Sequence, residues 1–593
     1  MEPCPMGPVT YENNPRNGNF LTDLIEGDFV TIYLFEPLRQ KGESTLTIKK
    51  VVHAYKNVIP TVNAGFGQSL GCNNDINCYP AWDFESDAVG MVLLANGTAL
   101  CSGALLMTAD QSFRPYFLSA FHCIDIDSAN GVLSANERNN VEDWMFKFQY
   151  KKTVCNGNSA SLGISYNGST FRAGFNNSDM ALLELDTSPV GNPEISYLGW
   201  DRTTNIPAAG TTIHHPQGDV MKISFDNNAL QSNANIINWS NGTQSSVNSH
   251  WTATLDNGTS ENGSSGSVIL NQNRRIVGQL HGGMNGCAPV TKYYGRFDVS
   301  WIGGGTNDTR LSNWLDPCGS GAITTNTARP FSISGSDLIC SSGTSFTVNN
   351  LPSGATINWT SSSSITLTSP QGSNPSTFSS VGSGNGWIQA TITVPNGCSN
   401  NIVVRKEVMR GAPLISYDPN EDFTMCRDIN TTSNNFFPVS IEGMDGSTTW
   451  EVQKITNNHS VTMQGNEVLV SLAYAPPYNY IAFKVRASNA CGFSNWLEYY
   501  VEVIDNCDSG GYNNYMVYPN PTSETINIKA KRTKEGSDNE IFYQLYDFNA
   551  ILIEKGDLNN QKKSIDVSNY KKGIYILKIK KGKEFETHSV IIK

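Results

Sequence analysis

The sequence has no apolar run of the roughly 18 residues that a membrane-spanning helix needs, and no long stretch repeats apolar residues at helical spacing. Only 16% of the 593 residues are charged, and the formal net charge is -12. No broad basic face is available before the Lys-rich C-terminal end, whose lysines alternate along predicted strands as on a solvated surface. We therefore expect no transmembrane segment and no nucleic-acid partner.

Metal-binding motifs are also missing. None of the 13 cysteines forms a zinc-like CxxC pair, and the sequence contains no HExxH motif. The adjacent histidines His214 and His215 would point to opposite faces of a strand, which argues against a shared metal ion. We expect no metal and no cofactor, and we read the cysteines as disulfides of an oxidising compartment.

Short apolar runs are abundant and alternate with turn-rich segments such as NNDIN and NGTSENGSSG. This pattern predicts an all-β chain made of sandwiches and barrels. The length favours three to five domains. The predicted parts are a pro-region or small β segment (1–65), a Trp- and His-rich part that holds the candidate site residues (66–320), an immunoglobulin-like or PKD-like domain (328–410), a second immunoglobulin-like domain (413–506) and a small C-terminal β-sandwich (512–593).

The N-terminal residues MEPCPMGPVTYENN lack the features of a signal peptide. We expect that the sequence starts partway into its precursor.

Cysteine spacing alone suggests several pairings. Cys72 with Cys78, and Cys101 with Cys123, are spaced like loop staples. Within the two predicted sandwiches the pairs would be Cys340–Cys398 and Cys426–Cys491. Spacing assigns no partner to Cys4, Cys318 or Cys507.

His122 is the candidate general base. The apolar strand FLSA runs directly into it, and Cys123 follows, with Cys101 one strand earlier as its disulfide partner. That disulfide also argues against Cys123 as a nucleophile. A structural histidine beside a cystine is the alternative interpretation.

Asp179 is the candidate carboxylate that orients the base. A polar turn precedes it and the buried strand MALLEL follows, so the carboxylate lies where a loop meets the core. Asp186, at the far end of the same strand, is the alternative.

Ser265 is the candidate nucleophile, in the segment ENGSSGSVIL. Flanking glycines at 263 and 266 allow positive φ and close approach of a substrate. The N–H groups of Gly263 and Ser265 would then point together at a developing oxyanion. Three serines compete in this segment, but only Ser265 holds the centre of G-x-S-G. Base, carboxylate, nucleophile and oxyanion donors are the four requirements of amide hydrolysis by a serine.

These motifs resemble those of chymotrypsin-like serine proteases, in the same chain order of His, Asp and Ser. LSAFHC is similar to the histidine motif, SDMALLEL to the aspartate motif and NGSSGS to the serine motif. More narrowly, CNNDINC, GWDR, IHHP, GQLHGG and TRLSNWLDP resemble bacterial lysyl endopeptidases. The resemblance covers about residues 66–320 and implies a double β-barrel, a peptide or protein substrate and no cofactor.

The same resemblance implies three disulfides: Cys72–Cys287, Cys78–Cys155 and Cys101–Cys123. It also places Trp239 and His281 beside the catalytic histidine, although ordinary packing is nearly as good an interpretation for both.

The substrate pocket departs from the lysyl endopeptidase pattern. In that family an aspartate shortly before a Y-G-R segment holds the substrate lysine, and here the matching residue is Lys292. A pocket-facing ammonium would repel a cationic side chain; the lysine would otherwise turn out to solvent or attract acidic side chains. No carboxylate compensates at Thr259, six residues before the serine. Gly282 and Gly283 are further pocket candidates, and the preference for a cleaved residue stays open.

The C-terminal segment VYPNPTSETINI, with KGIYILKI near the end, resembles the sorting domain of Bacteroidetes type IX secretion substrates. That resemblance implies a secreted or cell-surface protein and the secretion machinery as a partner. Together the motifs predict a secreted serine endopeptidase. The alternative is a non-catalytic surface-binding protein on a degenerate protease scaffold, which the two sandwich domains and the altered pocket motivate.

Overall fold

A computed structural model describes the chain in segments. These are Ile32, residues 46–48, 69–93, 100–127, 130–287, 289–395, 398, 401–417, 424–427, 433–442, 448–457, 459–465, 467–472, 480–505, 515–518, 522, 524–530, 541–547, 552–558, 562–581 and 584–592. Most of the predicted pro-region, residues 1–65, lies outside the described residues. The chain divides between Arg410 and Gly411 into two compact units.

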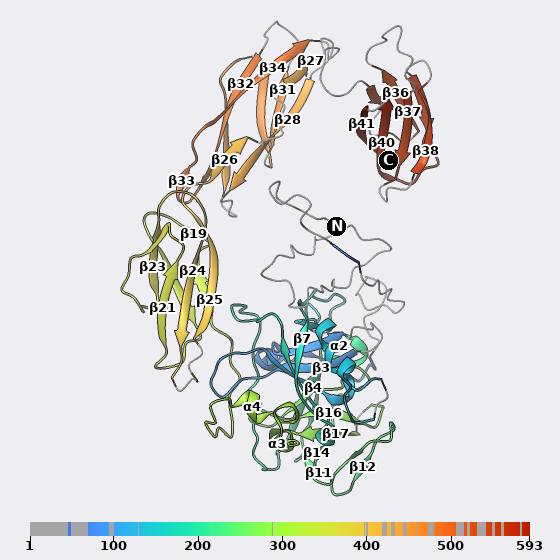
Figure 1. Ribbon diagram of the computed structural model, residues 1–593, viewed down its shortest axis with the longest axis vertical. Helices are drawn as coiled ribbons and strands as arrows, with labels where there is room; N and C mark the ends of the chain where they lie inside the picture. Colours follow the sequence, from blue (N-terminus) through green and yellow to red (C-terminus); the bar gives the residue numbers. More distant parts are fainter. Residues whose placement is uncertain are drawn as a thin grey trace. The chain divides into compact units, whose positions relative to one another are not determined.

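Two sheets form the part of the first unit that carries the candidate site (Figure 1). The first has seven strands in the order β6 (Ile164–Asn167), β5 (Met145–Phe148), β2 (Val89–Leu93), β3 (Leu100–Leu105), β4 (Tyr116–Ala120), β8 (Met180–Leu185) and β7 (Ser169–Phe175). The second has eight strands in the order β1 (Asn74–Asp75), β10 (Lys222–Asp226), β9 (Gly210–His214), β15 (Val268–Leu270), β16 (Ile276–Gly283), β17 (Val290–Arg296), β14 (His250–Leu255) and β11 (Gln231–Ser232). A separate hairpin pairs β12 (Ile237–Asn238) with β13 (Gln244–Ser245).

Strand β4 is buried on both faces, and this brings the two sheets together. Phe117 packs into one core with residues of its own sheet, whereas Tyr116 and Leu118 pack into a second core. That second core also contains Ile213 and Val268 from the eight-stranded sheet. Alternate side chains of one strand point to opposite faces, so β4 contributes to both cores. Strands β4 and β16 consequently lie side by side (Figure 1).

The helical elements are short. The α-helices are α1 (Asp83–Ser86), α2 (Ala135–Asn140), α3 (Phe297–Ile302) and α4 (Ser312–Leu315). The 3-10 turns are η2 (Ile76–Cys78), η3 (Pro80–Trp82), η4 (Phe121–Cys123), η5 (Val141–Asp143), η6 (Asn176–Ser178), η7 (Pro216–Gly218) and η8 (Asn307–Thr309). No helix in the described part of the chain is long and apolar enough to cross a membrane.

Two four-stranded sheets follow in the first unit. One contains β18 (Ser332–Gly335), β20 (Thr344–Asn349), β23 (Ser376–Ser380) and β22 (Ile365–Leu367). The other contains β19 (Leu338–Ile339), β25 (Ile402–Arg410), β24 (Gly384–Thr393) and β21 (Thr356–Ser361). Buried residues of both sheets, among them Phe346 and Ile388, share one core.

The second unit is also built from sheets. In its first part, one sheet has the order β26 (Leu414–Tyr417), β28 (Ser433–Glu442), β31 (Glu467–Leu472) and β30 (His459–Gln464). The other has the order β27 (Thr424–Arg427), β34 (Leu497–Asp505), β32 (Tyr480–Asn489) and β29 (Thr449–Lys454), and β33 (Gly492–Phe493) also pairs with β32.

The C-terminal part also has two sheets. One has the order β35 (Tyr515–Tyr518), β36 (Thr525–Ala530) and β39 (Lys562–Asp566), and the other has the order β38 (Leu552–Asp557), β37 (Ile541–Tyr546), β40 (Gly573–Lys581) and β41 (Glu584–Ile592). The prediction of an all-β chain, with a double β-barrel followed by sandwiches, is confirmed.

Long-range disulfides cross-link the protease part. Cys72 is bonded to Cys287 and Cys78 to Cys155, as the family resemblance implies, and not Cys72 to Cys78 as loop spacing suggested. Cys101 is bonded to Cys123.

The predicted Cys340–Cys398 pair is wrong, because Cys398 is bonded to Cys318. The strand register gives the reason. β19, which ends just before Cys340, pairs with β25 at Ile339↔Arg410, whereas Cys398 precedes the opposite end of β25. The two ends of β25, Ile402 and Arg410, are eight steps apart, which is about 26 Å at roughly 3.3 Å per residue. This separation is far larger than the distance between the Cα atoms of two bonded cysteines. The predicted Cys426–Cys491 pair stays a prediction, since the side chain of Cys426 lies outside the described residues, as do Cys4 and Cys507.

Candidate active site

His122 follows directly from strand β4. The 3-10 turn η4 begins after Ala120, and the Cys101–Cys123 disulfide ties this turn back to β3. Ala120 pairs with Met180 at the start of β8, and the N–H of Phe121 donates to the Asp179 carbonyl at 2.9 Å. The antiparallel register of β4 and β8 therefore brings the residue after one strand beside the residue before the other.

Asp179 uses both carboxylate oxygens on His122. Oδ2 lies 2.8 Å from Nδ1 of the imidazole, and Oδ1 accepts the His122 backbone N–H at 2.9 Å. Asp179 has φ 52° and ψ 33°, a left-handed conformation that aspartate tolerates better than most residues. The alternative carboxylate, Asp186, follows the other end of β8, about 23 Å of strand away. The structure therefore brings Asp179, and not Asp186, to the histidine.

Burial and charge act in opposite directions on His122. Burial alone would lower its pKa, but the Asp179 carboxylate raises the pKa above the ordinary imidazole value through charge and hydrogen bonding, with a smaller contribution from Asp125. The carboxylate is almost fully buried, whereas 30% of the His122 side chain is exposed. With Nδ1–H donated to Asp179, the other ring nitrogen is left to accept a proton.

The three competing serines differ in burial and in hydrogen bonding. Ser264 is buried and its hydroxyl lies 2.8 Å from Nδ1 of His214, while it also accepts the N–H of Glu261. Ser267 is buried as well, with its Oγ 3.3 Å from the hydroxyl of Thr212. Ser265 is partly exposed, and its hydroxyl has no hydrogen-bond partner among the described residues.

The turn around Ser265 is held against the strand that leads to His122. The carbonyl of Ser265 accepts the N–H of Ser102 at 2.8 Å, and the Gly266 N–H donates to Leu280 at 2.9 Å. At Gly266, φ is 81°, and a Cβ atom would lie 2.7 Å from the backbone nitrogen of Ala120. The structure thus places Ser265 next to the residues before His122, without a hydrogen bond between hydroxyl and imidazole.

Two backbone N–H groups beside Ser265 are unused. Neither the N–H of Gly263 nor that of Ser265 donates to a described residue. Gly263 has φ 89°, and a Cβ there would come within 2.9 Å of the His215 carbonyl oxygen. This turn therefore requires glycine, and it leaves two donors free for an anionic oxygen.

His281 lies beside His122, as the resemblance implied, and Trp239 contacts His281. The imidazoles of His122 and His281 stack with centroids 5.5 Å apart, and the Trp239 ring stacks on His281 at 3.4 Å. The pairing of β16 with β17 shifts register between Leu280 and Gly282, so His281 occupies a bulge. A bulge of this kind re-aims one side chain, here toward the triad.

A chain of hydrogen bonds fixes the protonation of His281. The Ser249 hydroxyl donates to the Ser246 carbonyl at 2.6 Å, so its oxygen accepts from Nδ1–H of His250 at 2.8 Å. Nε2 of His250 is then an acceptor for Nδ1–H of His281, 3.0 Å away. Burial, followed by the neighbouring His122 and His250, holds the pKa of His281 well below its ordinary value.

Because His281 is neutral, the Asp179 carboxylate interacts with His122 and not with His281. Its Nε2, 3.9 Å from Asp179 Oδ1, carries no proton in this tautomer and does not compete for the carboxylate. His250 was not predicted from the sequence. Its role depends on the β14–β17 register, which pairs it with Gly295, and no local motif indicates this.

The predicted pocket residues lie on four segments of the chain. Thr259 is buried, with its hydroxyl donating to the Gly286 carbonyl at 2.5 Å. A Cβ at Gly282 would lie 3.3 Å from the Trp239 ring. Lys292 is only 2% exposed, so the alternative in which it turns out to solvent is wrong. Glu261, which the sequence did not indicate, accepts the Leu70 N–H at 2.8 Å and so ties this region to residues before Cys72.

Comparisons with known proteins match two parts of the chain. Residues 66–297 match the family described as lysyl endopeptidase, C-terminal domain, and residues 516–593 match the secretion system C-terminal sorting domain. A lysyl endopeptidase of Pseudomonas aeruginosa is 27% identical over 296 residues, which is 46% of this chain and 59% of that protein. The chain therefore spans less than two thirds of that relative's length.

Solved structures show similar parts at low identity. The secreted serine protease VesC from Vibrio cholerae covers 86% of this chain and 96% of its own, with 11% identity and a TM-score of 0.26. The FN1–FN3 domains of chicken CNTN1 cover 44% and 97%, with 13% identity and a TM-score of 0.18.

The family matches confirm the resemblance that the motifs predicted. Residues 66–297 thus resemble the C-terminal domain of lysyl endopeptidases, and residues 516–593 resemble a secretion sorting domain, which indicates an extracellular or cell-surface location.

Proposed function

We propose that this protein is a secreted serine endopeptidase, with Ser265 as nucleophile, His122 as general base and acid, and Asp179 as the group that orients His122. The observation that carries the proposal is the pairing of His122 with both oxygens of Asp179 beside a turn that leaves two N–H donors free. These are the components that acyl transfer by a serine requires.

In the first half of the reaction, Ser265 Oγ attacks the carbonyl carbon of the scissile bond. Its proton passes to Nε2 of His122, and the imidazolium that forms is stabilised by Asp179. Ser265 and His122 are not hydrogen-bonded in the free protein, and substrate binding closes this contact, as is common for catalytic groups.

The tetrahedral intermediate carries its negative charge on the former carbonyl oxygen. The N–H groups of Gly263 and Ser265 bind this oxyanion, and one such donor typically contributes about 10²–10³-fold in kcat. Collapse breaks the C–N bond as His122 protonates the leaving amine. Water, deprotonated by His122, then hydrolyses the acyl-enzyme and restores Ser265.

The remaining parts of the chain fit secretion and presentation of this domain. We propose the division into residues 1–65, 66–320, 328–410, 413–506 and 512–593, with a pro-region or small β segment first and the two immunoglobulin-like domains between protease and sorting domain. The sorting domain would be read by the secretion machinery, and protein or peptide substrates would bind to the protease part.

A fluorophosphonate probe tests the proposal on the purified, matured chain. We expect covalent labelling of Ser265, and a loss of kcat/KM on denatured protein of about 10⁴-fold or more in Ser265→Ala. Ser363→Ala, which changes an exposed serine in the first sandwich, is the matched control and should retain labelling and activity.

If the wild-type chain neither reacts with the probe nor cleaves denatured protein, the protease proposal is wrong. Binding of a glycan or protein by residues 328–506 without labelling would instead support a surface-binding protein on a protease scaffold.

A further inference from the structure

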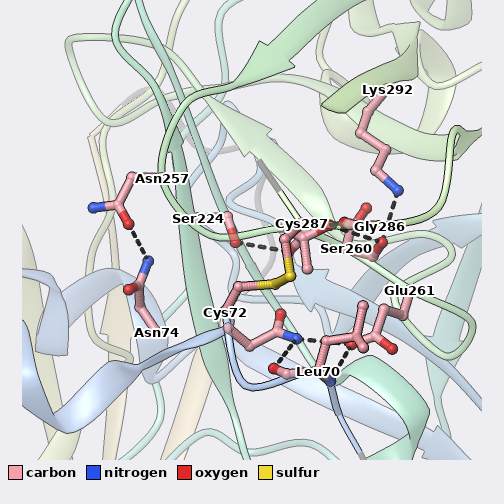
Figure 2. The surroundings of a disulfide bond; sticks show 12 residues. Leu70, Cys72, Asn74, Ser224, Asn257, Ser260, Glu261, Gly286, Cys287 and Lys292 are labelled. Atoms are coloured by element: carbon pink, nitrogen blue, oxygen red, sulfur yellow. Dashed lines mark hydrogen bonds between the residues drawn. A yellow bond between two sulfur atoms is a disulfide. The ribbon is translucent and has the colours of Figure 1, made fainter. Parts of the chain in front are cut away.

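Lys292 is a buried lysine in the same sheet as β15, the strand that follows Ser265. It lies on β17, where its Cα is paired with Gly283 on β16 and with Ala253 on β14. Its ammonium donates to the Ser260 carbonyl at 2.7 Å and to the Met284 carbonyl at 2.5 Å. Figure 2 shows the side chain pointing toward Ser260, above the Cys72–Cys287 disulfide.

The two carbonyls belong to the two segments that border Ser265. Ser260 lies five residues before Ser265 in the chain. Met284 follows β16, whose Leu280 accepts the N–H of Gly266. The ammonium of Lys292 therefore bridges these two segments, and the Thr259–Gly286 hydrogen bond joins them a second time.

Glycine at position 283 makes room for the lysine. The residue has φ 152°, and a Cβ there would meet Cδ of Lys292 at 3.0 Å and its Cα at 2.8 Å. The aliphatic part of Lys292 thus runs along a backbone without a side chain. This packing fixes the ammonium between the two segments.

The positive charge of Lys292 is not balanced by an ion pair. Among the described residues, no carboxylate lies within ion-pair distance of its Nζ. The charge of Glu261 acts on Lys292 and raises its pKa, but Glu261 Oε2 accepts hydrogen bonds from Leu70 (Figure 2) and from Asn73. The Lys292 ammonium donates two of its three N–H groups to neutral carbonyls, and its third N–H is available to a ligand.

We propose that Lys292 makes this protein an endopeptidase for acidic residues, with its ammonium binding the carboxylate of a glutamate or aspartate side chain on the acyl side of the scissile bond. The inference rests on the proposed serine protease function. A substrate carboxylate supplies the missing counter-charge of a buried cation, whereas a lysine or arginine side chain would place like charges together.

The charge state of Lys292 gives the preference a pH limit. Burial lowers its pKa to about 8, against the opposing effect of Glu261, so the side chain is mostly protonated at neutral pH. His214, the other titratable neighbour, stays neutral because burial lowers its pKa to about 3. Neither Ala253 nor Gly283, which pair with Lys292, titrates.

Matched peptide substrates that differ only in Glu, Gln or Lys before the scissile bond test the proposal on the matured chain. We expect kcat/KM for Glu to exceed that for Gln by about tenfold or more, the effect of a hydrogen bond to a charged group, and no measurable cleavage after Lys. Lys292→Met should bring the Glu/Gln ratio close to one while fluorophosphonate labelling continues. Lys222→Met, which changes a buried lysine on β10 that is paired with Asp219, is the control and should keep the preference.

Two outcomes separate this inference from the proposed function. If the wild-type chain is labelled by the probe but shows no Glu preference, or cleaves after Lys, the role of Lys292 is wrong and the protease function stands. If labelling is absent, both are wrong. Should Lys292→Met fail to fold, the wild-type Glu/Gln ratio still decides: it must fall as the pH rises past about 8, and a constant ratio overturns the inference.

Discussion

Nε2 of His250 lies 3.0 Å from Nδ1 of His281, and this hydrogen bond fixes the ring that stacks on the proposed catalytic base. His250 is in turn held by Ser249, whose hydroxyl proton is donated to the chain backbone. The chain of contacts keeps His281 neutral and directs the Asp179 carboxylate to His122 alone. His250 is therefore a positioning residue for the triad.

Replacement of His250 tests this positioning role. His250→Leu removes the acceptor of His281 Nδ1–H, and we expect kcat to fall about tenfold with KM little changed, because the substrate is not contacted. His250→Gln offers an amide oxygen in its place and should recover most of the lost kcat. A purely structural role would lower the amount of folded protein in both variants and leave kcat per labelled serine unchanged.

The three proposed site residues could be named from the sequence because each carries a local signature. His122 follows an apolar strand and precedes a cysteine, Asp179 joins a polar turn to a buried strand, and Ser265 lies among glycines. Their positions depend on the pairing of β4 with β8 and on the hydrogen bonds that the turn before β15 makes with Ser102 and Leu280.

The residues that sequence reasoning missed depend on longer-range register. His250 reaches His281 because β14 and β16 flank β17. Cys398 follows the end of β24 that is distant from Cys340, and it is bonded to Cys318 instead. The direction of the Lys292 side chain could not be predicted either, because it depends on how β17 packs between β16 and β14.

The pH dependence of activity follows from the His122–Asp179 pair. His122 must be neutral to accept the Ser265 proton, so kcat/KM should fall as the pH drops through the pKa of His122. Because Asp179 raises that pKa, the acidic limb should lie above the ordinary imidazole value of about 6.5.

The variant Asp179→Asn tests whether Asp179 sets the acidic limb of this pH profile. It removes the charge that raises the pKa of His122, so the acidic limb should move to lower pH while kcat falls by about 10⁴-fold. Steady-state kinetics between about pH 5 and 9 measure both effects. An acidic limb that stays in place in Asp179→Asn would show that another group controls the titration.

A substitution of Ser264 tests whether Ser265, and not its neighbour, is the nucleophile. Ser264→Ala leaves Nδ1 of buried His214 without a partner, and we expect a loss of unfolding free energy of about 1–3 kcal/mol. The Ser265 hydroxyl stays in place, so the folded variant should still react with the fluorophosphonate probe. Labelling that disappears in Ser264→Ala but persists in Ser265→Ala would reverse the assignment.

The disulfides should differ in their contributions to stability. Cys72–Cys287 closes a loop with a sequence separation of 215, whereas Cys101–Cys123 closes one of 22. Loop-closure entropy gives about 5 kcal/mol for the first and about 3 kcal/mol for the second. Urea midpoints, followed through loss of probe labelling, should therefore fall further in the double variant Cys72→Ser/Cys287→Ser than in Cys101→Ser/Cys123→Ser.

The same two double variants should also differ in substrate preference. Since Gly286 precedes Cys287 and accepts the Thr259 hydroxyl, Cys72→Ser/Cys287→Ser should lose part of its Glu/Gln preference, and Cys101→Ser/Cys123→Ser should keep it. The reverse order of preferences would place the acidic side chain away from the Lys292 region.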